Sequence, residues 1–100
     1  MIDWSRITGF EWDAGNAHKS ADKHGVAGPE AEQVFFNKPL LTASDDKHSV
    51  DEKRFHALGR TNARRYLQVT FTLRDAGTRL RVISARPMSR KEIVHYEQSS

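Results

Sequence analysis

Cysteine is absent from this 100-residue chain, which excludes disulfide frameworks, thiolate zinc sites and cysteine nucleophiles. No run approaches the roughly 18 apolar residues that a membrane-spanning helix needs, and no apolar core of a secretory signal opens the chain. Glycine-rich phosphate loops and nucleophile elbows are also missing. Asp45, Asp46 and His48 lack a supporting histidine pair, so we expect a solvated loop there rather than a metal site. We therefore expect a soluble cytoplasmic protein without a cofactor, whose chemistry uses arginine, lysine, histidine and carboxylate groups.

The basic residues are concentrated in the second half of the chain. Residues 1–50 hold five basic and eight acidic side chains, whereas residues 51–100 hold eleven basic and five acidic ones. Within residues 54–91, ten basic residues accompany one acid, Asp75. Such asymmetry is typical of a domain with a polyanionic partner. The alternative is a solvated basic face without a partner.

We expect one domain, because a chain of this length has room for a single hydrophobic core. The domain spans residues 1–100, without internal repeats or linkers. Residues 1–9 are an N-terminal extension whose large apolar side chains are Ile2 and Trp4. They either pack on the domain or meet a partner.

Two helices are predicted in the N-terminal half. Asp13 is a suitable N-cap for the first, which ends at Gly25 because glycine readily adopts the left-handed conformation that follows many helices. Pro29 at the first helical position begins the second. Its apolar stripe, at helical spacing, consists of Ala31, Val34 and Phe35.

Strands are predicted in the second half. The clearest covers residues 66–74, where apolar and polar side chains alternate. A polar loop precedes residue 54, with one helical turn capped by Ser49 together with Glu52. The last helix begins at Ser89 in a capping-box pattern with Glu92. The other predicted strands are residues 39–43, 54–60 and 80–86, and residues 10–12 look like the end of a strand.

Tight turns pair successive strands antiparallel, and helices at both ends of the run predict an α+β fold. It consists of two N-terminal helices, an antiparallel sheet of about four strands and a C-terminal helix. The helices must cover the apolar face of the sheet, and the opposite face carries the arginines. The apolar face is formed by Leu67, Val69, Phe71, Leu73, Leu80 and Val82.

Several guanidinium groups can converge on one groove, because alternate strand positions share a face. Guanidinium groups match phosphate oxygens bidentately, and neighbouring rings suit unstacked bases. We therefore predict a nucleic-acid-binding face; the alternative is an exposed face that uses arginine for solubility and edge protection. The predicted RNA-binding residues are Arg54, Arg64, Arg65, Arg81, Arg90, Lys91 and Tyr96.

Cleavage of RNA needs a base, an acid and cations on the phosphorane. Arg60 and Arg86, both at strand ends, are candidate cations. If the alternation holds, Arg86 points to the face of Leu80 and Val82, where a guanidinium requires a partner. The spacing selects no proton carrier, and capping or packing also explains each candidate. These candidates are His24, His48, Glu52, Glu92 and Tyr96.

Six segments carry a resemblance to a known family: FEWDAGNAHK (10–19), DKHGV (22–26), EAEQVFFNKPLL (30–41), HSVDEKRFHALGRT (48–61), VTFTLR (69–74) and RVISARPMSRKE (81–92). In these segments the chain resembles the BrnT family of toxins. It departs from the family pattern at Ser20, where asparagine is frequent, and at Ile93–Val94, where basic residues are usual.

The resemblance implies a toxin of a type II toxin–antitoxin pair, with a RelE-like fold and metal-independent cleavage of RNA that inhibits translation. It also implies a BrnA-like ribbon-helix-helix antitoxin, which forms a hetero-oligomer with the toxin and contacts operator DNA. No membrane partner is expected. Arg60 and Arg86 would hold phosphate. By motif, the resemblance carries over Lys23, His24, His48, Glu52, Arg54, Arg60 and Arg86.

The roles of the proton carriers stay open in this interpretation. His24 or Glu52 is the base, and His48 or Lys23 is the acid or an added cation. Two alternatives to a ribonuclease also remain. One is a non-catalytic module that binds nucleic acid or antitoxin within an autorepressor complex. The other is a toxin homologue that has lost its activity.

Overall fold

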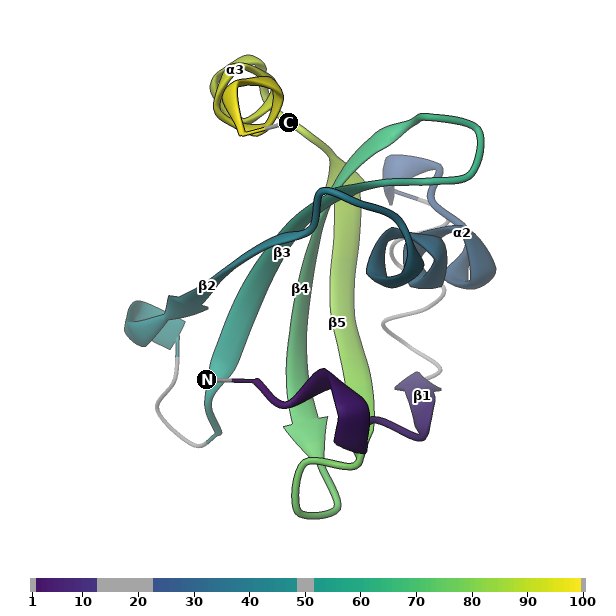
Figure 1. Cartoon of the computed structure of the whole chain (residues 1–100), viewed down its shortest axis with the longest axis vertical. Coiled ribbons are helices and arrows are strands. Elements are labelled where there is room, and N and C mark those ends of the chain that lie inside the picture. Colours follow the sequence, from purple (N-terminus) through teal and green to yellow (C-terminus); the bar gives the residue numbers. More distant parts are fainter. Residues whose placement is uncertain (1, 13–22, 49–51, 100) are drawn as a thin grey trace.

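The computed structural model describes residues 2–12, 23–48 and 52–99, which form one mixed five-stranded sheet with flanking helices (Figure 1). The strand order is β1-β5-β4-β3-β2, with β1 parallel to β5 and the other pairs antiparallel. The predicted α+β class is confirmed, whereas the expectation of about four strands omits β1. The strands are β1 (Gly9–Trp12), β2 (Leu41–Asp45), β3 (Arg54–Arg60), β4 (Tyr66–Arg74) and β5 (Arg79–Pro87).

β1 contains residues 10–12, which we expect to be the end of a strand, and lies at the edge of the sheet beside β5. Its parallel pairing corrects the expectation of an antiparallel sheet. Its residues Gly9–Trp12 register with Arg79 to Val82, and the Thr8 amide donates to the Thr78 carbonyl at 2.7 Å. Parallel pairing requires a long crossover connection. A four-residue strand contains too little alternation to reveal a partner so remote in the sequence.

Two α-helices are described, α2 (Gly28–Gln33) and α3 (Arg90–Gln98). Pro29 lies in the first turn of α2 as predicted, and the 3-10 turn η2 (Val34–Phe36) continues directly from it. Two further 3-10 turns are η1 (Trp4–Arg6) and η3 (Asp46–His48). Within the described residues, no helix has the length and apolar character that crossing a membrane requires.

The body of the predicted first helix and the turn capped by Ser49 lie outside the described residues. Lys23 and His24 are helical, and Gly25 follows them with a φ of +64°. This is the left-handed conformation expected at the end of a helix.

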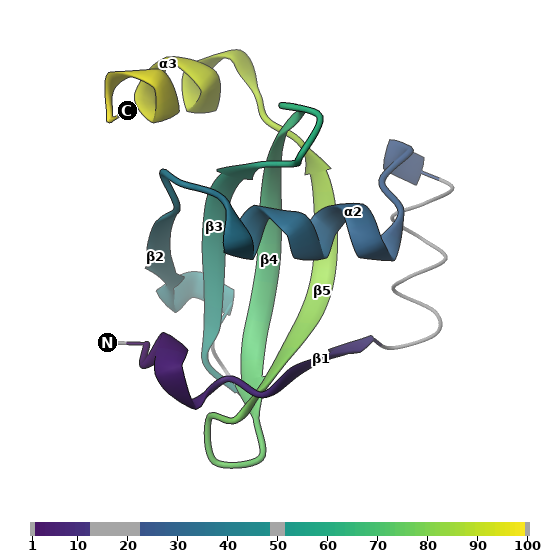
Figure 2. The same ribbon diagram turned by 45° about the vertical axis from the view of Figure 1, so that its right-hand side comes forward.

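The apolar face of the sheet is covered by α2, η2 and η1 (Figure 2). Phe71 lies at the centre of this core, and its ring centroid is 5.2 Å from that of Phe35 and 6.1 Å from that of Trp4. Ile2 and Ile7 also pack against the core. The N-terminal residues 2–12 are therefore seated on the domain.

The helix α3 does not cover the apolar face, which corrects the expectation that all helices do so. It crosses the end of the sheet near Tyr66 (Figure 2). The reason is the chain direction after β5: the Met88 amide donates to the Tyr66 carbonyl at 3.1 Å, so the chain turns across the strand ends.

An irregularity in β5 inverts its alternation. The register with β4 shifts between Thr70 and Phe71, where β5 contains one extra residue. Beyond this shift, Arg86 pairs with Gln68 on the face opposite the core. The prediction that Arg86 points to the face of Leu80 is therefore wrong, because one inserted residue moves every later side chain to the other face.

Candidate nucleic-acid interface

The sheet face opposite α2, here called the polar face, carries polar and cationic side chains from three adjacent strands. Strand register places these side chains in rows, because cross-strand partners share a face. The prediction that arginines gather on the face opposite the core is confirmed. The members are Arg54, His56 and Arg60 of β3, Tyr66, Gln68, Thr70, Thr72 and Arg74 of β4, and Arg79, Arg81, Ser84 and Arg86 of β5.

A histidine–carboxylate pair lies at the centre of the polar face. His56 Nε2 is 2.9 Å from Asp45 Oδ2 on β2, and His56 Nδ1 is 3.0 Å from Thr70 Oγ1 and 2.5 Å from Gln68 Nε2. The Asp45 side chain is only 10% exposed, whereas that of His56 is 38% exposed. The carboxylate orients the ring, and the Thr70 hydroxyl can donate or accept. With Nε2 donating to Asp45, Nδ1 accepts from the Gln68 amide, and a proton that arrives at Nδ1 replaces this bond while the Thr70 hydroxyl can become the acceptor.

Arg86 on β5 registers with Gln68, whose amide contacts the His56 ring of β3 on the other side. Its two Nη atoms donate to the Glu92 carboxylate oxygens at 2.7 and 2.9 Å. Hydrogen bonds from Arg86 keep the pKa of the Glu92 carboxyl below its usual value. Glu92 also forms the capping box with Ser89, as predicted. The partner that we expected for Arg86 is thus Glu92, and the guanidinium still has a partly exposed edge.

Two tyrosines and Arg60 form the end of the polar face under α3. Arg60 pairs with Tyr66, and the rings of Tyr66 and Tyr96 meet edge-on with centroids 5.1 Å apart. Tyr96 is buried, and its hydroxyl donates to the Pro39 carbonyl at 2.6 Å. Burial raises the pKa of the Tyr96 hydroxyl, so it stays protonated at neutral pH. The buried position of Tyr96 fits the alternative explanation, in which its ring packs in the fold. The half-buried Tyr66 is the ring more accessible to a nucleobase.

At the end of the polar face under α3, four of the predicted cations form no ion pair within the described part of the chain. They are Arg60, Arg64, Arg90 and Lys91. Arg64 lies on an exposed turn with a φ of +66°, and Arg90 and Lys91 are exposed in the first turn of α3. This end therefore offers cations that a polyanion can contact without displacing an internal acid.

Arg65, by contrast, connects the turn before β4 to the start of α2. Its Nη1 donates to the Gly25 carbonyl at 2.8 Å and to Glu30 Oε1 at 2.9 Å, and its Nη2 donates to the His24 carbonyl at 3.3 Å. These bonds place the half-buried His24 and the exposed Lys23 beside the turn before β4.

Glu52 lies at the opposite end of β4, where it pairs with Arg74 at 3.1 Å. Arg65, which binds the His24 carbonyl, and Arg74, which binds Glu52, lie at opposite ends of β4. At about 3.3 Å per residue, these two arginines are roughly 30 Å apart. The structure therefore does not bring His24 and Glu52 to one phosphate. Arg54 and Arg81 flank Thr72 near the Glu52 end. The His48 side chain lies outside the described part of the chain.

The pair of His56 with Asp45 is the part of the site that the sequence did not predict. His56 falls on the polar face by alternation alone, but its contact with Asp45 depends on the register of β2 against β3. The polar residues Gln68 and Thr70 on β4 were the available signal, because polar neighbours can hold an imidazole ring. Among the described residues, no three His, Asp or Glu side chains form a cluster that would hold a metal ion.

Comparisons with known proteins place the chain in a family. A sequence profile of the family described as "Ribonuclease toxin, BrnT, of type II toxin-antitoxin system" matches residues 12–92. The crystal structure of the Brucella abortus ribonuclease toxin BrnT, at 1.1 Å resolution, is similar with a TM-score of 0.63 and 23% identity, over 82% of this chain and 97% of that chain. No curated protein sequence matches. The structural likeness establishes the fold, the profile spans most of the sequence, and the chain therefore belongs to the BrnT family of type II toxin–antitoxin toxins.

Proposed function

We propose that this chain is an endoribonuclease toxin that cleaves RNA on the polar face by general acid–base catalysis without a metal. The observation that carries the proposal is the arrangement around Gln68, whose amide contacts the oriented imidazole of His56 and whose register partner on β5 is Arg86. The family description, a ribonuclease toxin, supports the cleavage of RNA.

In the proposed reaction the substrate 2′-hydroxyl attacks the adjacent phosphorus, and the 5′-oxygen of the next nucleotide leaves. His56 accepts the 2′-hydroxyl proton, the leaving oxygen takes a proton from water, and the hydroxide so formed takes the proton back from His56, so the products carry a 2′,3′-cyclic phosphate and a 5′-hydroxyl. Arg60 and Arg86 stabilise the phosphorane. Their Cα atoms lie roughly 12 Å apart by strand spacing, which two long side chains can close over one phosphate.

The remaining cations of the polar face bind the phosphates on either side of the cleaved bond in this proposal. We assign Arg54 and Arg81 to the phosphates on one side of His56, and Arg64, Arg90 and Lys91 to the phosphates on the Tyr66 side. His24, Glu52, His48 and Lys23 are the alternative proton carriers, to be tested singly. Each lies nearer one end of the face or outside the described residues.

A double variant tests the proposal. Arg60→Ala/Arg86→Ala should lower the rate of RNA cleavage by roughly 10²–10³-fold, because both cations stabilise developing charge, and should abolish growth arrest when expressed in cells. Arg6→Ala, which removes an exposed arginine in η1, is the matched control. Equal arrest by wild type and double variant, or intact RNA after incubation with purified protein, would contradict the proposal.

A non-catalytic binding module is the second candidate, and the cations without ion pairs near Tyr66 favour it. It predicts RNA binding whose logarithm falls with that of the salt concentration by about 0.7 per phosphate contact, with no cleavage products. Appearance of cyclic-phosphate ends over time excludes it.

We further propose that the antitoxin is a BrnA-like ribbon-helix-helix protein in a cytoplasmic hetero-oligomer, which reaches operator DNA through the antitoxin alone. Membership of a type II family supports the existence of such a partner. The reading frame beside the toxin gene tests this identity. A short frame with a ribbon-helix-helix pattern supports it, and the absence of one contradicts it.

A further inference from the structure

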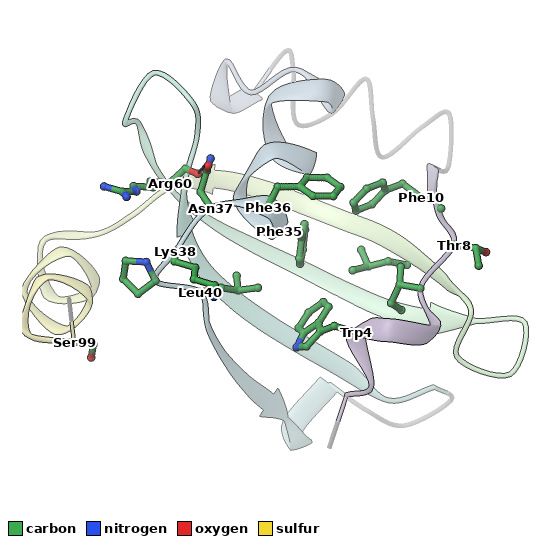
Figure 3. Close-up of a pocket in the computed structure, with 14 residues that line it drawn as sticks. Trp4, Thr8, Phe10, Phe35, Phe36, Asn37, Lys38, Leu40, Arg60 and Ser99 are labelled. Atoms are coloured by element: carbon green, nitrogen blue, oxygen red, sulfur yellow. Dashed lines mark hydrogen bonds between the residues drawn. The ribbon is translucent and has the colours of Figure 1, made fainter.

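An open groove on the face opposite the polar face is not used by the proposed reaction. It has a volume of about 1090 Å³ and lies between η1, η2 and the residues before β2 (Figure 3). The rings of Trp4, Phe10 and Phe35 line it, together with that of Phe36. Small-molecule pockets have volumes of about 300–1,000 Å³. The groove therefore has room for several side chains of a polypeptide.

Of the aromatic residues in the groove, Trp4 and Phe36 are exposed, whereas Phe10 and Phe35 are partly buried against the core. Phe36 is 76% exposed, and its ring meets that of Phe10 edge-on at 5.9 Å between centroids. Phe35, one residue earlier, packs against the buried Phe71. Clustered aromatic side chains on a fixed backbone are typical of the centre of a protein–protein interface. Phe36 thus has the features of an anchor residue that a partner covers.

The groove has positive charge at one end. Lys38 and Arg60 line this end, and neither forms an ion pair with a described residue. Among the described residues that line the groove, none is acidic. A complementary partner has apolar side chains along its length and carboxylates at one end. RNA would need cations along the whole groove, and a second copy of this chain would bring the same positive charges.

We propose that this groove binds the apolar face of an amphipathic, acidic segment of the antitoxin polypeptide, in the manner of a helix in a groove. The identity of the partner rests on the proposed function. Arg60 belongs to both surfaces: it lines the groove, yet its guanidinium points away from the rings (Figure 3). An antitoxin carboxylate on Arg60 removes this cation from the RNA phosphate. Occupation of the groove therefore inhibits cleavage without covering His56.

The experiment compares two charge-introducing variants of the full chain, Phe36→Glu and Val94→Glu. Val94 is 51% exposed on α3 and does not line the groove, so it is a matched control. The probe is the purified polypeptide encoded beside the toxin gene, titrated by calorimetry. Phe36→Glu should weaken its binding by roughly 30-fold or more, and Val94→Glu should change it by about twofold at most. Free Phe36→Glu should cleave RNA at the wild-type rate.

Four results overturn the inference. The first is that the polypeptide does not bind wild type, and the second is that both variants change its affinity equally. The third is that Phe36→Glu loses RNA cleavage but keeps its affinity for the antitoxin, and the fourth is that Phe36→Glu changes self-association alone. The third identifies a nucleic-acid surface and the fourth a contact between copies. If no variant cleaves RNA but Phe36→Glu selectively weakens the antitoxin, the proposed function fails while the groove assignment stands.

Discussion

At the scale of single residues, the proposed chemistry depends on how Asp45 and His56 hold each other. The nearly buried Asp45 carboxylate accepts a hydrogen bond from His56 Nε2, so His56 Nδ1 faces Thr70 and Gln68. A ring fixed in this way presents one tautomer to the polar face, as a second partner does for catalytic imidazoles in general. Asp45 contacts the His56 ring and is only 10% exposed, so we assign it the role of a positioning residue.

Asp45→Asn should separate positioning from binding. The amide keeps the shape of the side chain but loses the charge that orients the imidazole. We expect kcat to fall by about 10²-fold with KM nearly unchanged, because general acid–base groups contribute about 10²–10⁴-fold. Steady-state cleavage of a short RNA measures both constants. A raised KM with unchanged kcat would instead assign Asp45 to RNA binding.

At the scale of elements, the ion pair of Arg86 with Glu92 connects β5 to α3. The same carboxylate accepts from the Ser89 amide at 2.8 Å, so one side chain caps the helix and holds the guanidinium of Arg86. The attachment of α3 therefore determines how Arg86 is presented.

Glu92→Gln should destabilise the protein by about 1 kcal/mol at neutral pH, because it weakens an ion pair and a cap. The folded pKa of Glu92 lies below the ordinary value of about 4.3. Its contribution is thus complete above that value and is lost as the pH falls through the folded pKa. Urea unfolding at several pH values should show the difference between wild type and variant shrinking under acid conditions. A constant difference from pH 7 to pH 3 contradicts this assignment.

The contact between η2 and β3 depends on Gly59. A Cβ at this position would lie 2.8 Å from Val34 Cβ and 3.2 Å from the Val34 carbonyl oxygen. Gly59→Ala should therefore lower the free energy of unfolding by about 1–3 kcal/mol, as overpacked sites do. Gly28→Ala is the control, because its nearest atom, Trp12 Cε2, is at an ordinary 3.4 Å. Equal melting temperatures of the two variants would show that η2 can move away.

The sequence predicts elements with local signals and misses those that depend on distant pairing. The alternation of residues 66–74 and the capping box at Ser89 are each visible within a few residues, and both are confirmed. The parallel pairing of β1 and the extra residue in β5 are not visible, because each is defined by a partner strand. The same reason hides the pair of His56 with Asp45.

At the scale of the whole molecule, the sheet separates two surfaces. The polar face gathers arginines around His56, and the aromatic groove lies on the other side, with Arg60 common to both. A basic domain can therefore hold RNA on one face while a polypeptide partner occupies the other. RNA and the polypeptide partner then compete for Arg60 alone and not for the whole polar face.

The central claim is cleavage at the polar face with His56 as proton acceptor. The most direct measurement is the end-group analysis of RNA incubated in EDTA with purified wild type, His56→Gln or the control His95→Gln, an exposed histidine of α3. We predict cyclic-phosphate and 5′-hydroxyl ends for wild type and His95→Gln, and a rate about 10²–10⁴-fold lower for His56→Gln. Intact RNA with wild type, or cleavage by His56→Gln at the wild-type rate, would contradict the claim.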